Sequence, residues 1–214
     1  AMAHDPEIMT RGRAEEGTRT VAGAFVLLAL LVLPVYPHFV SPNETTRWAL
    51  AAAAVEEKTL EVTRTAGILG PRMEDVAEVG GRLYSNKAPG TARAALPGYV
   101  AVRPFAGPPS PSSLRPSLTA MRLAGATLPV LLLAVLFARL VPEAGRREAL
   151  FALLFATPLL PYSLLLFSHA LVAACLFGAW AALFGPAPEA ARFRRDVAAG
   201  ALLGLAVLSE YPAA

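Results

Sequence analysis

Charged residues and cysteines are scarce in this sequence. Asp, Glu, Lys and Arg make up 16% of its 214 residues, whereas hydrophobic residues account for 55%. Ordinary soluble domains carry more charge and less apolar side chain than this. The single cysteine, Cys175, excludes an internal disulfide, and no cysteine–histidine spacing typical of a zinc site occurs. Because Cys175 lies in an apolar stretch, we interpret it as a packing residue.

Two further features are missing, and each excludes a class of partner. The net charge of +3 is not gathered into a basic stripe with interleaved aromatic residues, so no nucleic-acid partner is expected. The sequence also has no glycine-rich phosphate loop, and we expect no nucleotide or other cofactor.

The hydrophobic residues are arranged in blocks that predict membrane spans. Residues 21–40 are uncharged and long enough to cross a hydrocarbon core of roughly 30 Å. They end in Pro34, Pro37 and His38 rather than in a small-residue cleavage site, which favours a retained transmembrane helix over a signal peptide. We expect further spans at 118–141 and 197–214.

The uncharged run of residues 150–187 is too long for one comfortable span. Pro158 and Pro161 disfavour an unbroken helix. We therefore divide the run into two transmembrane helices that turn near residues 162–169. The predicted fold class is an all-α polytopic membrane protein with five spans.

Short basic segments indicate the orientation of these spans. With two helices in residues 150–187, the segments at 11–13, 145–147 and 192–195 all fall on one side, and Lys and Arg favour cytoplasmic loops. The tail 1–20 and the loops 142–149 and 188–196 are then cytoplasmic. Residues 41–117 form one long extracytoplasmic loop.

Several elements are expected within this loop. A helix beginning at Asn43 would place Trp48 at the membrane interface, where it would lie on the bilayer. "TLEVTRTAG" (59–67) alternates like a strand, and "EVGGRLY" (78–84) contains a glycine turn. Residues 91–105 could be a second interfacial helix interrupted at Pro97, and residues 107–117 read as a stiff linker.

Polar candidates for a site gather on the extracytoplasmic side. Glu44 could accept the proton of a hydroxyl group, or it could simply be a carboxylate in the first turn of a helix. Lys87 could bind a phosphate, or it could extend towards lipid headgroups. The remaining candidates are Asn43, Arg47, Tyr84, Ser85, Asn86, Ser168, His169, Glu210 and Tyr211.

Two of these candidates lie close to apolar segments. His169 is a poor candidate for a metal ligand, because no second ligand lies at helical spacing from it. The alternative is a histidine that caps a turn. Glu210 lies roughly 20 Å along a helix from its basic flank. A carboxylate at such a depth is costly unless it is paired or faces a wet cavity, so we expect a site or a structural pair there.

Four segments together resemble a known family. "PNETTRWALAAAAVEEKTLEV", "GGRLYSNKAPG", "ATPLLPYSLLLFSHAL" and "GLAVLSEYPAA" are similar to bacterial membrane glycosyltransferases of family 39 type. These belong to the GT-C superfamily, with the protein O-mannosyltransferases and the lipid A aminoarabinose transferases. The likeness runs from about Ser41 to Ala214, and relatives have many more spans, so we expect an N-terminal fragment.

The resemblance implies an enzyme of the bacterial inner membrane with a GT-C-like transmembrane bundle. Such an enzyme takes a sugar from a polyprenyl-phosphate donor and transfers it, with inversion, to an extracytoplasmic glycan, lipid or protein. The family's acidic pair reads Asn43-Glu44 here, which leaves Glu44 as the expected base. Lys87 matches the residue that meets the carrier phosphate, with Tyr84, Ser85 and Arg47 as expected helpers. Asn86 replaces a glutamate implicated in metal binding, so we expect no metal.

Two other functions fit the same pattern. In a transporter or flippase, Glu210 and His169 would line a path, and discontinuous helices would recur in two halves, but no internal repeat is visible. In a non-catalytic membrane partner, the outer loop would dock another protein. The enzyme remains our first hypothesis, with His169, Glu210 and Tyr211 as a further part of its pocket.

Overall fold

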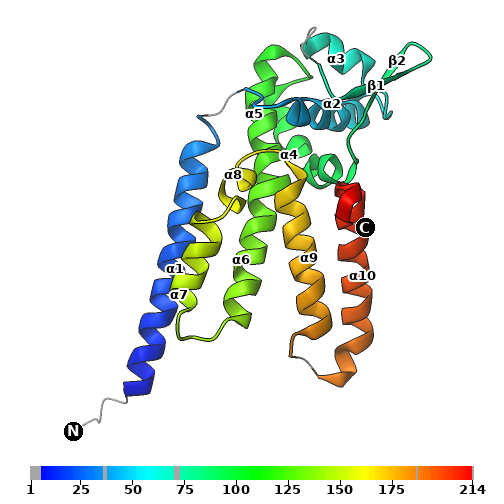
Figure 1. Ribbon diagram of the computed structural model, residues 1–214. Coiled ribbons are helices and arrows are strands. Elements are labelled where there is room, and N and C mark those ends of the chain that lie inside the picture. Colours follow the sequence, from blue (N-terminus) through cyan, green and yellow to red (C-terminus); the bar gives the residue numbers. More distant parts are fainter. Residues whose placement is uncertain (1–5, 36–37, 70–72, 187, 214) are drawn as a thin grey trace.

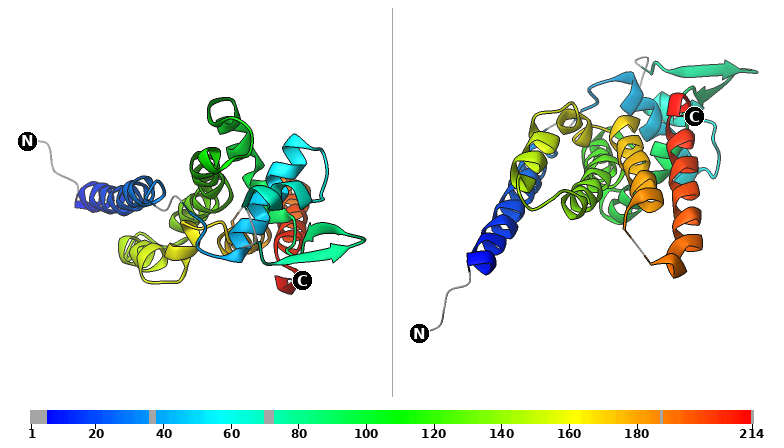
Figure 2. Two further views of the ribbon diagram at one scale, coloured as in Figure 1. Left: turned by 90° about the horizontal axis from the view of Figure 1, so that it is seen from above. Right: turned by 60° about the horizontal axis from the view of Figure 1, so that its bottom comes forward.

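The computed structural model describes residues 6–35, 38–69, 73–186 and 188–213. Long helices run side by side and carry a smaller cap at one end, where the chain end after α10 also lies (Figure 1). The two further views show the long helices spread in a row and the cap displaced to one side of it (Figure 2). The protein is predominantly helical, as the sequence predicts, with one small hairpin in the described part.

The first group of long helices is α1 (Pro6–Val32), α6 (Leu128–Leu140) and α7 (Arg146–Phe155). Their shared core includes Phe25, Val130 and Leu154, which are fully buried. Helix α1 ends at Val32, so the helix expected over 21–40 is wrong at its end. Pro34 explains this, because proline disrupts the hydrogen bonding and packing of a continuing helix.

One continuous helix crosses the whole molecule. It joins α5 (Pro111–Arg122), a π-helical turn η1 (Leu123–Thr127) and α6. The linker expected at 107–117 is wrong in its second half, because Ser110 forms a capping box with Ser113 and Pro111 begins the helix. Among the described residues, this 30-residue helix is the one long and apolar enough to cross a membrane, so the five-span bundle stays a prediction.

Two antiparallel helices form the other side of the molecule. Helix α8 (Leu159–Ser163) lies between α7 and α9 (Ser168–Phe184), so the chain breaks in the proline-containing region. Helix α10 (Arg192–Ser209) follows α9 after the short η2 (Glu189–Ala191), and η3 (Tyr211–Ala213) comes after it. Because α9 and α10 run in opposite directions, the first residues of α9 meet the last residues of α10.

The cap is built from residues of the long loop. Helix α2 (Pro42–Glu56) packs against α4 (Gly90–Ala106), and α3 (Thr63–Leu69) precedes the hairpin of β1 (Val76–Val79) and β2 (Arg82–Ser85). The hairpin turns at Gly80 and Gly81, which both have positive φ, as the glycine pair predicts.

Three expectations for the cap are wrong. Residues 63–67 of the segment expected as a strand lie in α3, and Pro97 lies inside an unbroken α4. Trp48 is fully buried and donates from Nε1 to Ser117 Oγ at 2.9 Å, so it does not lie at a bilayer surface. Together with Tyr99 and Leu118, Trp48 forms a protein core under the cap.

Candidate functional site

A polar cavity of about 320 Å³ lies where the cap meets the α9–α10 pair. Its walls come from α2, from the segment after β2, and from the adjoining ends of α9 and α10. Eight of the candidates that the sequence offers for a site line it: Asn43, Arg47, Asn86, Lys87, Ser168, His169, Glu210 and Tyr211. The other lining residues are Ala88, Phe167, Ser209 and Pro212.

Arg47 is the most unusual group in the wall. Its side chain is 4% exposed, and its guanidinium donates to Leu166 O at 3.3 Å and to Ser168 Oγ at 3.2 Å. Nη1 also lies 3.3 Å from both oxygens of Asn43, but buried Nε has no partner in the described part of the chain. Burial lowers the pKa of Arg47, while the nearby carboxylates of Glu210, Asp75 and Glu44 raise it.

No ion pair within 4.0 Å involves Arg47 among the described residues. An arginine remains protonated in a protein, so this buried positive charge is neutralised only at a distance. A buried cation beside a polar cavity is stabilised by an anion that enters the cavity. Arg47 therefore offers an incoming anion a buried guanidinium in a cavity whose lining also includes the carboxylate of Glu210.

Lys87 supplies a second positive charge. Its Nζ lies 3.1 Å from Asp75 Oδ1, and its side chain is 28% exposed. Asp75 adopts a left-handed conformation, with φ +60°, and its carbonyl accepts from Asn86 N at 3.1 Å. This hydrogen bond extends the pairing of β1 and β2 by one position and brings Asp75 next to Lys87, so a carboxylate holds the lysine at the cavity.

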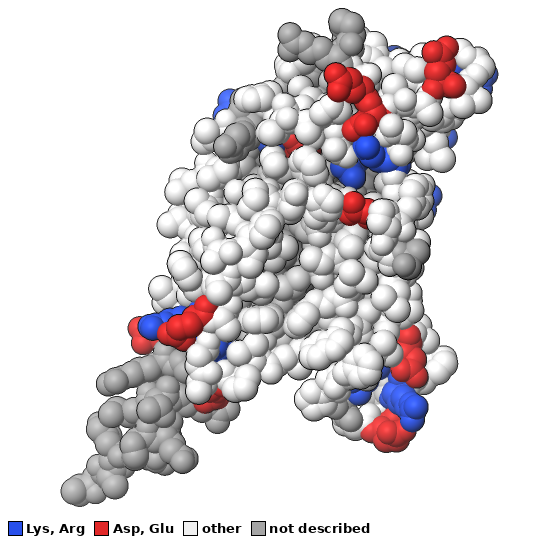
Figure 3. All heavy atoms as spheres, viewed as in Figure 1, with Lys and Arg blue, Asp and Glu red and all other residues white. Residues whose placement is uncertain are grey.

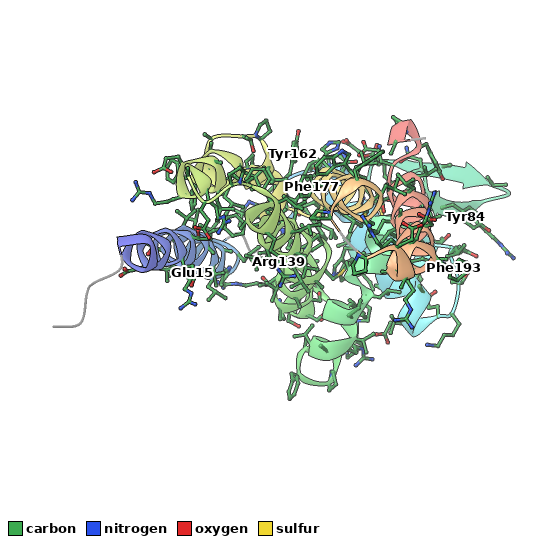
Figure 4. The ribbon with its side chains drawn as sticks, turned by 90° about the horizontal axis from the view of Figure 1, so that it is seen from below. Glu15, Tyr84, Arg139, Tyr162, Phe177 and Phe193 are labelled. Atoms are coloured by element: carbon green, nitrogen blue, oxygen red, sulfur yellow. The ribbon has the colours of Figure 1, made fainter. Side chains whose placement is uncertain are left out.

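Tyr84 and Ser85 do not line the cavity, contrary to the expectation that they bind the donor phosphate. Tyr84 pairs with Ala77 across the hairpin and forms an isolated bridge with Glu61. Figure 4 shows Tyr84 on the side of the molecule where the hairpin projects. Ser85 Oγ accepts from Lys87 N at 3.2 Å, so it shapes the turn that carries Lys87.

His169 and Glu210 form a pair across the adjoining helix ends. Glu210 Oε2 lies 2.9 Å from His169 Nδ1 and accepts from Ser168 Oγ at 2.9 Å. A carboxylate at the first turn of α9 is favoured by the helix dipole. The ring of His169 also packs edge-on against Tyr162, with centroids 4.5 Å apart. Glu210 is thus paired and faces a cavity, as its position in the sequence predicts.

Glu44 does not line the cavity. It lies in the first turn of α2, and its contacts do not support the role of base expected for it. It is fully buried, and each of its oxygens accepts one hydrogen bond from Arg122 at 2.8 Å. Oε1 also accepts from Leu166 N and Oε2 from Val40 N, at 2.8 and 2.9 Å. A carboxylate with both oxygens engaged by protein donors has no access to a substrate hydroxyl. It instead fixes the cap to the long central helix.

Arg122 was not predicted as the partner of Glu44. The signal was present, because an arginine next to an apolar span is costly unless it finds a partner. Asp75 was not predicted because it precedes β1 whereas Lys87 follows β2, and only the pairing of the two strands brings them together.

The remaining cavities are less polar or lie elsewhere. One of them, of about 750 Å³, lies at the opposite end of the molecule and is lined by Glu15 of α1, Arg139 of α6 and Arg146 of α7, among others. Figure 4 shows Glu15 and Arg139 on these neighbouring helices, seen from below. In the described ranges, no three His, Cys, Asp or Glu side chains cluster in a way that would hold a metal ion.

The fold and the cavity define a helical protein with a buried cation at a polar site. Comparisons with protein-family models, with curated proteins and with solved structures find no match for this chain.

Proposed function

We propose that this chain is part of a membrane glycosyltransferase that takes a sugar from a polyprenyl-phosphate donor. The observation that carries the proposal is the buried guanidinium of Arg47, which forms no ion pair among the described residues and lines a cavity that also holds Lys87. A phosphodiester that links a sugar to a lipid is an anion with several acceptor oxygens. Arginine and lysine are the side chains that bind such groups.

The surface of the protein fits a bilayer in this proposal. On the face shown in Figure 3, acidic and basic residues gather at the two ends, and the middle is almost free of them. Exposed leucines and phenylalanines cover the long helices, among them Leu30, Leu132 and Phe184. The continuous α5–α6 helix would cross the bilayer, with the cavity at its extracytoplasmic side.

The position of the cavity also fits a lipid-linked donor. Ser168 and His169 belong to the first turn of α9, and the exposed residues that follow in this helix, such as Leu176 and Trp180, are apolar. A headgroup in the cavity would therefore lie next to the apolar surface of these helices. The prenyl chain could extend along that surface into the bilayer.

Equilibrium binding of polyprenyl phosphate to the full native protein, purified in detergent, tests the proposal. Arg47→Gln should weaken binding by about ten- to one hundredfold, which corresponds to the loss of a charge-assisted hydrogen bond. Arg93→Gln is the matched control, because Arg93 is an exposed residue of α4 outside the cavity lining.

A sugar-transfer assay with the same protein separates the proposal from its alternatives. Transfer from a polyprenyl-phosphate sugar, lost in Arg47→Gln and retained in Arg93→Gln, supports the enzyme. Binding without any transfer would favour a transporter or flippase. Absence of both binding and transfer would leave the non-catalytic partner and contradict the proposal.

A further inference from the structure

We propose that His169 is the group that accepts the proton from the acceptor hydroxyl, and that Glu210 positions it. This inference rests on the proposed function. It replaces the role expected of Glu44, which is buried in its ion pair with Arg122. Asn43 lines the cavity but cannot act as a base, because a side-chain amide is not basic near neutral pH.

The hydrogen bond to Glu210 fixes the tautomer of the imidazole. An ionised carboxylate only accepts hydrogen bonds, so the 2.9 Å contact places the proton of the neutral ring on Nδ1. The unprotonated nitrogen is then Nε2, which carries a lone pair. Nε2 has no hydrogen-bond partner in the described part of the chain, and the His169 side chain is 44% exposed in the cavity wall.

The surroundings hold this ring in one orientation. Tyr162 packs edge-on against it, and the Phe167 ring lies nearly parallel to it at 6.1 Å between centroids. Ser168 ties Glu210 to Arg47, since Ser168 Oγ donates to the carboxylate and accepts from the guanidinium. The same network therefore connects the proposed anion site to the proposed base.

The reaction balances with these groups alone. The acceptor hydroxyl oxygen forms a bond to the anomeric carbon, while the bond from that carbon to the phosphate oxygen breaks. The electron pair of the broken bond leaves with polyprenyl phosphate, whose charge faces Arg47 and Lys87. The hydroxyl proton moves to His169 Nε2, and the resulting imidazolium is stabilised by Glu210.

His169→Ala in the full native protein is the direct test. We expect kcat to fall by about one hundredfold or more, in the range of general-base contributions, whereas polyprenyl-phosphate affinity changes less than about twofold. Added imidazole should restore part of the activity, because removal of the side chain leaves space in the cavity wall. His38→Ala is the matched control, since His38 is exposed outside this cavity and its contact with Arg122 uses the backbone carbonyl.

Glu210→Gln gives a second measurement. It should lower kcat by about tenfold, because the imidazolium loses its partner charge, whereas polyprenyl-phosphate affinity changes less than about twofold. The charged and titratable groups that share the cavity or contact the ring are Arg47, Lys87, Tyr162, Glu210 and Tyr211.

The outcomes separate the two proposals. If the unaltered protein transfers sugar and His169→Ala retains full activity, the assignment of the base is overturned and the proposed function stands. If His169→Ala retains activity but Glu210→Gln loses it, Glu210 itself is the base and the inference is also overturned. If the unaltered protein transfers no sugar, the proposed function is contradicted, and the inference that rests on it is contradicted as well.

Discussion

At the scale of single residues, the buried pair of Glu44 and Arg122 is a stability element. Both side chains have no exposed surface. Glu44→Gln should therefore destabilise the protein by about 3–5 kcal/mol, because it leaves an uncompensated buried guanidinium. Thermal unfolding in detergent measures this effect, with Glu78→Gln on the exposed hairpin as the control. A Glu44→Gln variant with wild-type stability and no sugar transfer would instead indicate that Glu44 acts in catalysis.

A second residue-scale prediction concerns pH. Glu56 accepts from Arg103 Nη2 at 2.9 Å and from Tyr99 Oη at 3.0 Å. The hydrogen bond from Arg103, the largest cause, lowers the pKa of Glu56 below its usual value of 4.5. The stability from this group is present above pH 4.5 and is lost as pH falls through the lowered pKa. Glu56→Gln should flatten the acidic limb of a thermal-stability profile, and an unchanged limb would contradict this.

A third residue-scale prediction concerns the stability of the fold at alkaline pH, which depends on Tyr99. Burial, followed by the contact with Glu56, raises the pKa of Tyr99 above its usual value of 10.0. A raised pKa stabilises the fold fully below pH 10.0, and this contribution is lost as pH rises further. Tyr99→Phe cannot ionise, so its stability should fall less between pH 10 and pH 11 than that of the unaltered protein. A parallel fall in both proteins would show that Tyr99 is not the group responsible.

The candidate site was only partly predictable at this scale. Asn43 and Glu44 are neighbours, and adjacent residues of a helix point about 100° apart. Only one of them can face a given cavity, and the structure places Asn43 there and Glu44 against Arg122. The direction of a helix face relative to its neighbours depends on packing that the sequence pattern does not specify.

At the scale of elements, close contact between helices depends on small residues. A side chain at Gly98 of α4 would place its Cβ 2.1 Å from the Ala120 carbonyl oxygen of α5. Gly98→Ala should therefore force α4 and α5 apart and lower stability by about 1–3 kcal/mol. Gly67→Ala is the matched control, because a Cβ there meets nothing within 4 Å and alanine favours a helix. Equal unfolding temperatures for both variants would contradict this packing.

The cap also shows which elements a sequence can predict. The helix over Pro42–Glu56 follows from its helix-forming residues, but its placement on the bilayer was wrong. Residues from Trp48 to Val55 are apolar on every side, and a helix that is apolar all round is a buried one. An interfacial helix needs a polar face, which this segment lacks. The hairpin was easier to predict because its turn depends on two local glycines.

At the scale of the whole molecule, the proposed function predicts an orientation. The hairpin and the last residues of α10 lie at one end, and the start of α10 lies at the other (Figure 1). The cavity is at the hairpin end, because residues after β2 and after α10 line it. In intact cells, a membrane-impermeant thiol reagent should label Glu78→Cys but not Arg194→Cys. The native Cys175 is 3% exposed and provides a low background. Labelling of Arg194→Cys alone would invert the topology, and labelling of both without lysis would contradict a membrane barrier between them.

The π-helical turn at Leu123–Thr127 sets the rotation between the two halves of the central helix. A π turn holds one residue more than an α turn, so it shifts the angular position of everything that follows by about 100°. Arg122 lies just before the turn and faces Glu44, while Val130 and Ala134 lie after it and face α1 and α7. Deleting one residue, such as Ala124, would regularise the helix but rotate one of these faces out of register. The additional residue therefore allows one continuous helix to pack against two cores that lie in different directions around it.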